Sequence, residues 1–402
     1  MAGENRIDGM RPDAPELAPF GPLAIGVTTV ELVAQGRIDV VHAGEGALPR
    51  HDRRLTVEVW YPAAGNAVGG VYENVVLRDG RKTANLHGRA VRNAPPLRPS
   101  TGDGYPLIII SHGYPGNRFL MSHLAENLAT KGFVVAAIDH RDSTYDDPAY
   151  LSGNGFGSTL VNRSLDQLFV LDAMARLSGE AGLLDGMVDA SHTGIIGYSM
   201  GGYGALVTAG AGVSAAAVEM ASEMEGGVPD GLLAMHLADS DSHKAMLDPR
   251  VRAVMPVAPW GMHRGIWEVS ALGDVTVPVL LVAGSADDTS GYEDGVRAIY
   301  QGLDNCERYL LTFELAGHNV AAPIPAPLES MERVDWLDFV PFEHYADPVW
   351  DTVRMNNIAQ HYATAFFSHY LKEQPAVAEI LADGPAIAGT VMASSKPLKT
   401  GH

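Results

Sequence analysis

A short apolar strand that turns at once into a glycine-rich helix is the feature that most constrains this chain. Residues 193–202 read TGIIGYSMGG, and their centre fits the pattern Gly-x-Ser-x-Gly at Gly197, Ser199 and Gly201. So sharp a turn strains the central residue and leaves no room for side chains two positions before and after it. The helix begins directly behind the Ser199 hydroxyl, with free amide groups at its start. The pattern therefore predicts an exposed serine nucleophile at a strand end.

Short apolar runs alternate with helical stretches through the rest of the chain. The unbroken runs are typical of strands buried on both faces, and we place strands at residues 107–110, 133–138, 193–197, 251–257, 278–283 and, as the last one, 309–313. Residues 215–218 compete with 251–257 for the fourth strand. Helical spacing predicts helices near 120–131, 163–178, 201–212, 291–303 and 351–373. This alternation predicts an α/β fold, with a mostly parallel central sheet and helices on both faces.

We assign the remaining segments of the sequence to edge strands, loops and insertions. Residues 24–34 and 54–61 alternate apolar and polar positions, which indicates antiparallel edge strands. Residues 143–160 are rich in Gly, Ser, Asp and Tyr and predict a loop, with a flexible turn at 153–157. We expect a single domain over residues 1–402. The candidate cap elements inserted into it are residues 63–105, residues 219–249 and the aromatic segment 319–350.

Composition limits the partners that the chain can have. The 402 residues are 46% hydrophobic, and 48 acidic against 28 basic residues give a formal net charge of -20. This charge disfavours nucleic acid and anionic membrane surfaces. No apolar run is long enough to span a membrane, and residues 1–19 lack the apolar region of a signal peptide. We therefore expect a cytoplasmic protein with no nucleic-acid partner and no stable membrane association, and a homo-oligomer stays open.

The serine needs a base to take its proton and an acid to orient that base. In sheets of this kind the order along the chain is Ser, then Asp or Glu, then His. Asp287 follows the predicted strand 278–283, and His318 follows the last strand, after Gly317, which permits a tight turn. The order predicts a catalytic triad of Ser199, Asp287 and His318, with Asp288 as the competing acid.

An oxyanion site needs two N–H donors where negative charge develops. One should be the amide of Met200, directly after the serine, and the other the amide of Tyr114, in the loop after strand 107–110. His112 in that loop is expected to be structural. The side chains of Tyr114, Tyr198 and Trp260 are predicted to bind substrate.

Other polar groups carry weaker signals. His236, Asp239, Asp241 and His243 lie close in the sequence, but their spacing fits no metal site, and a solvated face is the better interpretation. No phosphate-binding glycine loop follows a buried strand, which disfavours nucleotide use. The sequence therefore predicts neither a metal nor a cofactor.

Several of these motifs resemble one branch of a known superfamily. The runs SHGYPGNR at 111–118, GFVVAA at 132–137 and DHRD at 139–142, with VWYP at 59–62 and the serine turn, are similar to the platelet-activating-factor acetylhydrolase and dienelactone-hydrolase-like branch of the α/β-hydrolases. Met200 and the segment 258–260 also resemble bacterial cutinase-like polyesterases. The resemblance covers roughly residues 24–320. It implies an α/β-hydrolase fold and serine esterase chemistry without a metal or cofactor. Tyr198 departs from the pattern, because His is common before the nucleophile.

The resemblance supports Ser199, Asp287 and His318 as the triad and the amides of Tyr114 and Met200 as oxyanion donors. The predicted activity is hydrolysis of a small-molecule carboxylic ester through an acyl-enzyme. An amidase, a lactonase and an interfacial lipase that use the same triad are the alternatives. The lipase is considered because residues 219–249 carry apolar side chains suited to a lid. From another class, the alternative is a non-catalytic binding protein with this fold. The complete triad argues against it.

Overall fold

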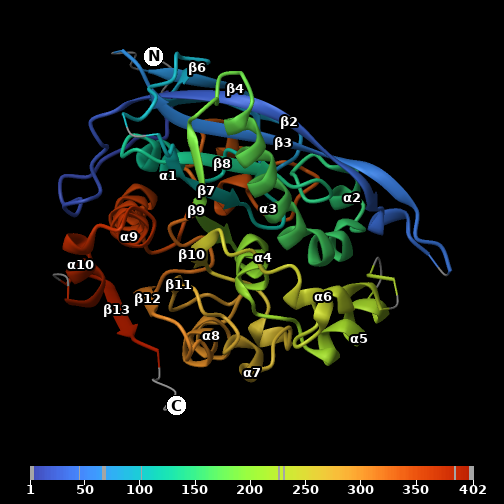
Figure 1. Ribbon diagram of the computed structural model, residues 1–402. Coiled ribbons are helices and arrows are strands. Elements are labelled where there is room, and N and C mark those ends of the chain that lie inside the picture. Colours follow the sequence, from blue (N-terminus) through green and yellow to red (C-terminus); the bar gives the residue numbers. More distant parts are fainter. Residues whose placement is uncertain are drawn as a thin grey trace.

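A ten-stranded sheet forms the centre of the molecule (Figure 1). The structure is a computed structural model that describes residues 4–44, 46–65, 69–100, 102–224, 227–229, 231–383 and 386–397. Neighbouring strands follow the order β13-β12-β11-β10-β9-β7-β8-β3-β2-β6. Their bounds are β2 (Ala24–Ile38), β3 (Arg50–Ala63), β6 (Val91–Arg92), β7 (Tyr105–Ser111), β8 (Val134–Asp139), β9 (Val188–Tyr198), β10 (Val251–Val257), β11 (Val279–Gly284), β12 (Arg308–Phe313) and β13 (Thr390–Ser395).

Six neighbouring strands, from β8 through β7, β9, β10 and β11 to β12, run parallel. They correspond to the predicted apolar runs, and their side chains are almost fully buried, as at Ile109 and Leu281, both 0% exposed. On the β8 side, β3 and β2 continue the sheet antiparallel, as predicted. Neither is an edge strand, which corrects the prediction, because β3 lies between β8 and β2, and β2 also pairs with β6. The competing segment at 215–218 lies in a helix, so 251–257 is the strand. The predicted mostly parallel sheet is confirmed.

Helices cover both faces of this sheet, as Figure 1 shows. The side chains of α1 (Ser122–Ala129) and α9 (Thr352–Lys372) belong to the core on one face. Those of α3 (Gly155–Gly179), α4 (Met200–Ala209) and α8 (Arg297–Gly302) belong to the core on the other. Each fully buried large side chain contributes about 1.5–3 kcal/mol. The shorter helices are α2 (Pro148–Leu151), α5 (Ala215–Glu223), α6 (Asp241–Lys244), α7 (Val269–Leu272) and α10 (Ala378–Asp383).

Single helical turns, labelled η, occur mainly in the connections. They are η1 (Val40–His42), η2 (Leu232–His236), η3 (Met262–Arg264), η5 (Leu328–Met331), η6 (Pro341–His344) and η7 (Pro375–Val377), with a π-helical turn at η4 (Tyr292–Val296). The predicted helix 291–303 is thus divided into η4 and α8. Among the described residues, no helix combines the length and the apolar character needed to cross a membrane.

The predicted insertion 63–105 contributes two strands to a small second sheet, and the N-terminal segment contributes the third. Its strands follow the order β1-β5-β4, with bounds β1 (Asn5–Arg6), β4 (Gly70–Val76) and β5 (Thr83–Gly88). Glu126 of α1 anchors this sheet, because its buried carboxylate accepts hydrogen bonds from the Tyr72 hydroxyl at 2.5 Å and from the amides of Arg89 and Ala90. Burial raises the pKa of Glu126 despite these donors. Residues 66–68 and 101 of this insertion, and 225, 226 and 230 of the insertion 219–249, lie outside the described residues.

The predicted loop over 143–160 is wrong for most of its length. Residues 148–151 form α2, and α3 begins at Gly155, inside the predicted flexible turn. Tight packing accounts for the difference, since a Cβ at Gly155 would lie 2.0 Å from the carbonyl oxygen of Asp142. Gly155 is needed for this close approach, and the tertiary contact outweighs its low helix propensity.

A second prediction, that 309–313 is the last strand, is also wrong. The strand β13 pairs antiparallel with β12 over six residues, from Arg308 opposite Ser395 to Phe313 opposite Thr390. Its side chains are only half-buried or exposed. The apolar signal that marks the central strands is therefore absent from this segment of the sequence.

Candidate active site

Ser199 lies in the sharp turn between β9 and α4. Its backbone angles, φ 53° and ψ -113°, are strained for a residue with a side chain. Both flanking glycines are required, because a Cβ at Gly197 would lie 2.1 Å from the carbonyl oxygen of Gly201, and one at Gly201 would lie 2.0 Å from that of Ser111. The Ser199 amide is held by the carbonyl of Val257, 2.9 Å away. The strained turn is the predicted one, although Ser199 is only 7% exposed.

The structure brings Ser199, His318 and Asp287 together in one hydrogen-bonded line. The Ser199 Oγ lies 3.0 Å from Nε2 of His318, and Nδ1 of His318 lies 2.9 Å from Oδ2 of Asp287. With Nδ1 donating to the carboxylate, Nε2 is the imidazole nitrogen that can accept the serine proton. The three side chains therefore have the relative positions that nucleophilic activation of a serine requires.

Asp287, rather than Asp288, contacts the imidazole. Its Oδ1 also accepts hydrogen bonds from the amides of Thr289 and Ser290, each at 2.9 Å. Burial raises the pKa of the Asp287 carboxyl, but hydrogen bonds from His318 and these amides outweigh burial and lower it below its ordinary value. The Asp288 side chain is exposed and, within the part of the chain that the structure describes, accepts only from the neighbouring Thr289 hydroxyl.

The end of β11 and the turn after β12 fit against each other without space for a side chain. A Cβ at Gly284 would lie 2.3 Å from the carbonyl oxygen of Ala316 and 2.4 Å from that of Gly317. The amide of Ala286 donates to the carbonyl of Ala316, 2.9 Å away. These contacts fix the Asp287 turn relative to the His318 turn.

Asn319 holds the other side of the His318 turn. Its Oδ1 accepts from the Tyr198 hydroxyl at 3.0 Å, and its Nδ2 donates to the carbonyls of Glu343 and Ala346. The Tyr198 ring lies against the His318 ring, with centroids 5.3 Å apart. Tyr198 was predicted to line the substrate pocket. Its side chain is only 3% exposed, so it does not lie on the wall of an open pocket. It lies beneath the imidazole.

The amide of Met200 directly follows Ser199 at the start of α4, and the amide of Tyr114 lies in the loop after β7. Among the described residues, neither amide donates a hydrogen bond to a protein acceptor. A Cβ at Gly113, which precedes Tyr114, would lie 3.4 Å from the Ser199 Cβ, so this loop runs directly against the serine turn. Two unpaired N–H groups in this position can bind an oxyanion.

His112 fixes the shape of the same loop. Its Nδ1 donates to the carbonyl of Gly113 at 2.8 Å, and its Nε2 accepts from the amide of His140 at 3.1 Å. Burial lowers the pKa of His112 well below its ordinary value, which keeps the ring neutral. The guanidinium of Arg163 also donates to the Gly113 carbonyl. His112 therefore has the structural position that the sequence indicated.

A buried ionic network below this loop was missed by sequence reasoning. Arg53 of β3, 1% exposed, donates to Asp166 at 2.9 Å and to Asp142 at 2.7 Å. Asp166 also accepts from Nδ1 of His140, whose Nε2 contacts the Ser111 hydroxyl. Burial raises the pKa of Asp166, but Arg53 and His140 together lower it far below its ordinary value. The DHRD run at 139–142 was the only sequence signal for this network.

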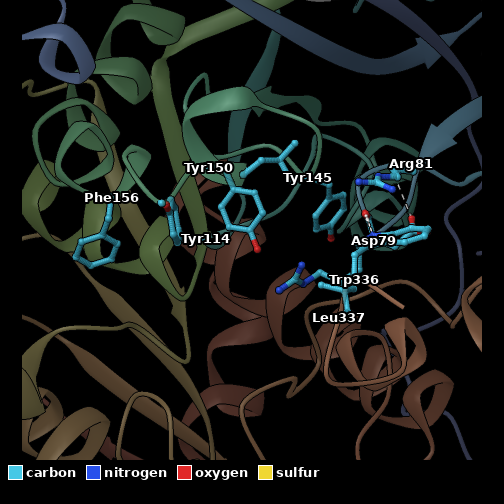
Figure 2. A pocket seen from close by; sticks show the side chains of 12 residues that line it. Asp79, Arg81, Tyr114, Tyr145, Tyr150, Phe156, Trp336 and Leu337 are labelled. Carbon is cyan, nitrogen blue, oxygen red and sulfur yellow. Dashed lines mark hydrogen bonds between the residues drawn. The ribbon is translucent and has the colours of Figure 1, made fainter. Parts of the chain in front are cut away.

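A cavity of about 620 Å³ adjoins the site at Tyr114. Figure 2 shows Phe156, Tyr114, Tyr150 and Tyr145 across it, with the turn of Asp79 and Arg81 at the far side. Two of the predicted cap segments, 63–105 and 319–350, contribute to its wall, whereas no described residue of the segment 219–249 does. The lining residues are Arg78, Asp79, Gly80, Arg81, Tyr114, Tyr145, Tyr150, Leu151, Gly153, Phe156, Trp336 and Leu337.

Of the predicted substrate-binding residues, Tyr114 lines this cavity. Trp260 is half-buried and packs edge-to-face on Phe156, with centroids 5.3 Å apart, but it is not part of the cavity wall. Trp260 therefore packs behind Phe156, and it does not line the cavity itself.

The sequence cluster around residue 236 does not converge on a metal site. Nε2 of His236 bonds the carbonyl of Val161, and Nε2 of His243 bonds that of Gly210. Asp239 pairs with Lys244. Within the described part of the chain, no group of three or more His, Cys, Asp or Glu side chains has the arrangement of a metal site. Both histidines are buried, which corrects the predicted solvated face for these two residues.

Comparisons with known proteins agree with this architecture. A ferulic acid esterase from Streptomyces cinnamoneus superposes with a TM-score of 0.65, over 98% of this chain and 100% of that one, at 22% identity. Residues 64–151 match the family model described as platelet-activating factor acetylhydrolase, isoform II. The chain therefore has the α/β-hydrolase fold, and part of it is similar to the acetylhydrolase family model.

The curated proteins to which this chain is similar fall into two groups. Cutinase est2 of Thermobifida alba is 25% identical over 240 residues, which cover 60% of this chain and 61% of the cutinase. A platelet-activating factor acetylhydrolase of Cavia porcellus is 49% identical over 61 residues, covering 13% of this chain and 14% of that protein. The chain thus spans about three fifths of the length of the cutinases it matches. These findings confirm the predicted resemblance to both groups.

The family match also bears on the predicted insertion at 63–105. Most of it lies inside the matched range 64–151, together with the Tyr114 loop and the DHRD run. The strands β4 and β5 of the small sheet therefore lie within the range that matches the acetylhydrolase family model.

Proposed function

We propose that this α/β-hydrolase is a serine hydrolase that cleaves carboxylic esters. The observation that carries the proposal is the line from Ser199 through His318 to Asp287, with distances of 3.0 and 2.9 Å. Relatives named as a cutinase, a platelet-activating factor acetylhydrolase and a ferulic acid esterase support ester chemistry.

In the proposed mechanism, His318 takes the proton of Ser199 as its Oγ attacks the ester carbonyl. The amides of Met200 and Tyr114 donate to the oxyanion of the tetrahedral intermediate. Asp287 holds the imidazole with Nδ1 protonated and stabilises the imidazolium. His318 then protonates the leaving alcohol, which departs and leaves an acyl group on Ser199. Water, activated by the same imidazole, releases the acid and regenerates the hydroxyl.

A fluorophosphonate probe tests the nucleophile directly. We expect one adduct, at Ser199, when the labelled protein is mapped by mass spectrometry, and none in Ser199→Ala. Denatured protein is the control, because it keeps the serine but loses the hydrogen bond to His318. An adduct at another residue, or none in the native protein, would overturn the mechanism.

Substrate type is tested with 4-nitrophenyl esters of two to twelve carbons, beside the matching anilides. We expect turnover of esters and no measurable turnover of anilides. Faster anilide cleavage would favour an amidase, and a rate that rises only above the solubility limit of a long ester would favour a lipase. The cytoplasmic location, the lack of a cofactor, the single domain and the oligomeric state stay predictions.

A further inference from the structure

The cavity beside Tyr114 ends at a guanidinium that has no ionic partner. Among the described residues, no carboxylate lies within 4 Å of Arg78, and its side chain donates no hydrogen bond to a protein group. Instead, the guanidinium carbon lies 4.9 Å from the centroid of the Phe339 ring and 5.7 Å from that of Tyr150. Aromatic contacts on the guanidinium restrict its position and leave the N–H groups at its edge free to donate.

The charges around Arg78 leave this end of the cavity net positive. Arg81 lies over the Trp336 ring at 4.2 Å and has no carboxylate partner within the described residues. The one carboxylate on the wall is Asp79, whose Oδ1 accepts from the amides of Arg81 and Lys82 and thereby closes the turn. Two guanidinium groups against one carboxylate contrast with the formal net charge of -20 over the whole chain.

The middle of the cavity combines apolar walls with free hydroxyl groups. Tyr114 packs edge-to-face on both Tyr150 and Phe156, with centroids 5.2 and 5.4 Å apart. In the described structure, neither the Tyr114 nor the Tyr150 hydroxyl is hydrogen-bonded to a protein group. The wall therefore offers ring surfaces to an apolar chain or flat ring, and hydroxyl donors to a polar group beyond it.

We propose that this cavity binds one arm of an anionic ester, and that Arg78 binds the acidic group at the end of that arm. The preferred ligand is a carboxylate, because a planar guanidinium and a carboxylate form two parallel hydrogen bonds. The arm enters past Tyr114, whose amide is assigned to the oxyanion, and its apolar part lies against the tyrosines. This inference rests on the proposed ester hydrolysis and adds a substrate class to it.

Two matched pairs of esters test the proposal on either side of the scissile bond. On the acyl side, mono-(4-nitrophenyl) esters of dicarboxylic acids with four to ten carbons are compared with the same compounds methylated at the free carboxyl. On the alcohol side, the acetate of 4-hydroxyphenylpropanoic acid is compared with that of its methyl ester, by proton release. We expect the anionic member of one pair to have the higher kcat/KM, by about tenfold or more at the best length.

Variants assign this preference to Arg78. We expect Arg78→Gln to lower the anionic-to-neutral ratio of kcat/KM by about tenfold. The control is Arg98→Gln, which removes an exposed guanidinium that contacts Asp185 and lies outside the cavity wall, and it should keep the wild-type ratio. Raising the salt concentration should reduce the preference in the wild type more than in Arg78→Gln.

A binding measurement separates the two proposals from each other. Calorimetric titration of Ser199→Ala with monomethyl suberate is expected to show binding that Arg78→Gln in the same background weakens about tenfold. If neutral esters are turned over but neither pair favours its anionic member, the Arg78 proposal fails and the esterase proposal stands. If no ester is turned over while the anion still binds through Arg78, the esterase proposal fails. Equal ratios in Arg78→Gln and the wild type would also overturn the assignment.

Discussion

The hydroxyl of Tyr198 donates a hydrogen bond to Oδ1 of Asn319, 3.0 Å away, and so joins the residue before the nucleophile to the residue after the histidine. We expect Tyr198→Phe to lower kcat by about five- to tenfold, because an ordinary hydrogen bond of about 1 kcal/mol no longer holds the imidazole in line. Steady-state kinetics on a neutral nitrophenyl ester measure this effect. In a double-mutant cycle with Asn319→Ala, the two effects should not add. Fully additive effects would show that the bond does not act on catalysis.

The two neighbouring aspartates after β11 should differ widely in their effect on catalysis. Asp287→Asn should reduce kcat by about 10³- to 10⁴-fold, because the amide no longer favours the imidazole tautomer that accepts the serine proton. Asp288→Asn, at an exposed position, should change kcat by less than about twofold. The reverse result would place the acid at Asp288.

Gly284 is expected to tolerate no side chain. Gly284→Ala places a methyl group 2.3 Å from a backbone carbonyl of the His318 turn, and backbone atoms cannot rotate away. We expect a loss of about 2–3 kcal/mol in the free energy of unfolding and a fall in kcat. Urea denaturation and kinetics measure the two effects. Gly182→Ala is the control, since nothing lies within 4 Å of its added Cβ, and a similar loss in that variant would contradict the explanation.

His123 makes the fold sensitive to mild acid. Burial lowers the pKa of His123 to about 3, and neither ring nitrogen has a hydrogen-bond partner within the described residues. Below the unfolded-state pKa of about 6.5, the unfolded chain therefore binds a proton that the folded chain does not, so the free energy of unfolding falls as the pH falls. At pH 5 this single group costs about 2 kcal/mol relative to pH 7.

Urea denaturation of His123→Leu at pH 7 and pH 5 tests this linkage. We expect the difference between the two pH values to be about 2 kcal/mol smaller than in the wild type. Leu124→Ala, at a fully buried position on the same helix, should lower stability at both pH values and leave the difference unchanged. An unchanged difference in His123→Leu would rule out the linkage.

The central strands could be predicted from the sequence because they are buried on both faces. The apolar run at 107–110 lies inside β7, and 278–283 differs from β11 by one residue at each end. The positions of Ser199, Asp287 and His318 follow from these strands, since each residue lies in the turn after one of them. The same logic fails for β13, whose half-exposed residues carry no such signal.

Contacts between distant parts of the chain account for what the sequence did not reveal. Arg53 and Asp166 are 113 residues apart, and neither position carries a local pattern that pairs them. The start of α3 depends on the close packing of Gly155, which single-sequence reasoning assigns to a turn. The position of Tyr198 before the nucleophile suggested a place on the pocket wall, but its ring is buried against His318 and its hydroxyl bonds Asn319, 121 residues further along.

The cavity and the triad use separate parts of the chain. The triad residues follow β9, β11 and β12, whereas the cavity wall comes from the turn at 78–81, the loop and helices at 145–156, and residues 336–337, with Tyr114 between the two. Substitutions in the cavity wall can therefore accumulate without disturbing the hydrogen-bonded line of Ser199, His318 and Asp287. For protein engineering, the turn at 78–81 is the natural place to diversify selectivity. The Tyr114 side chain can be varied as well, because only its backbone amide is assigned to the oxyanion.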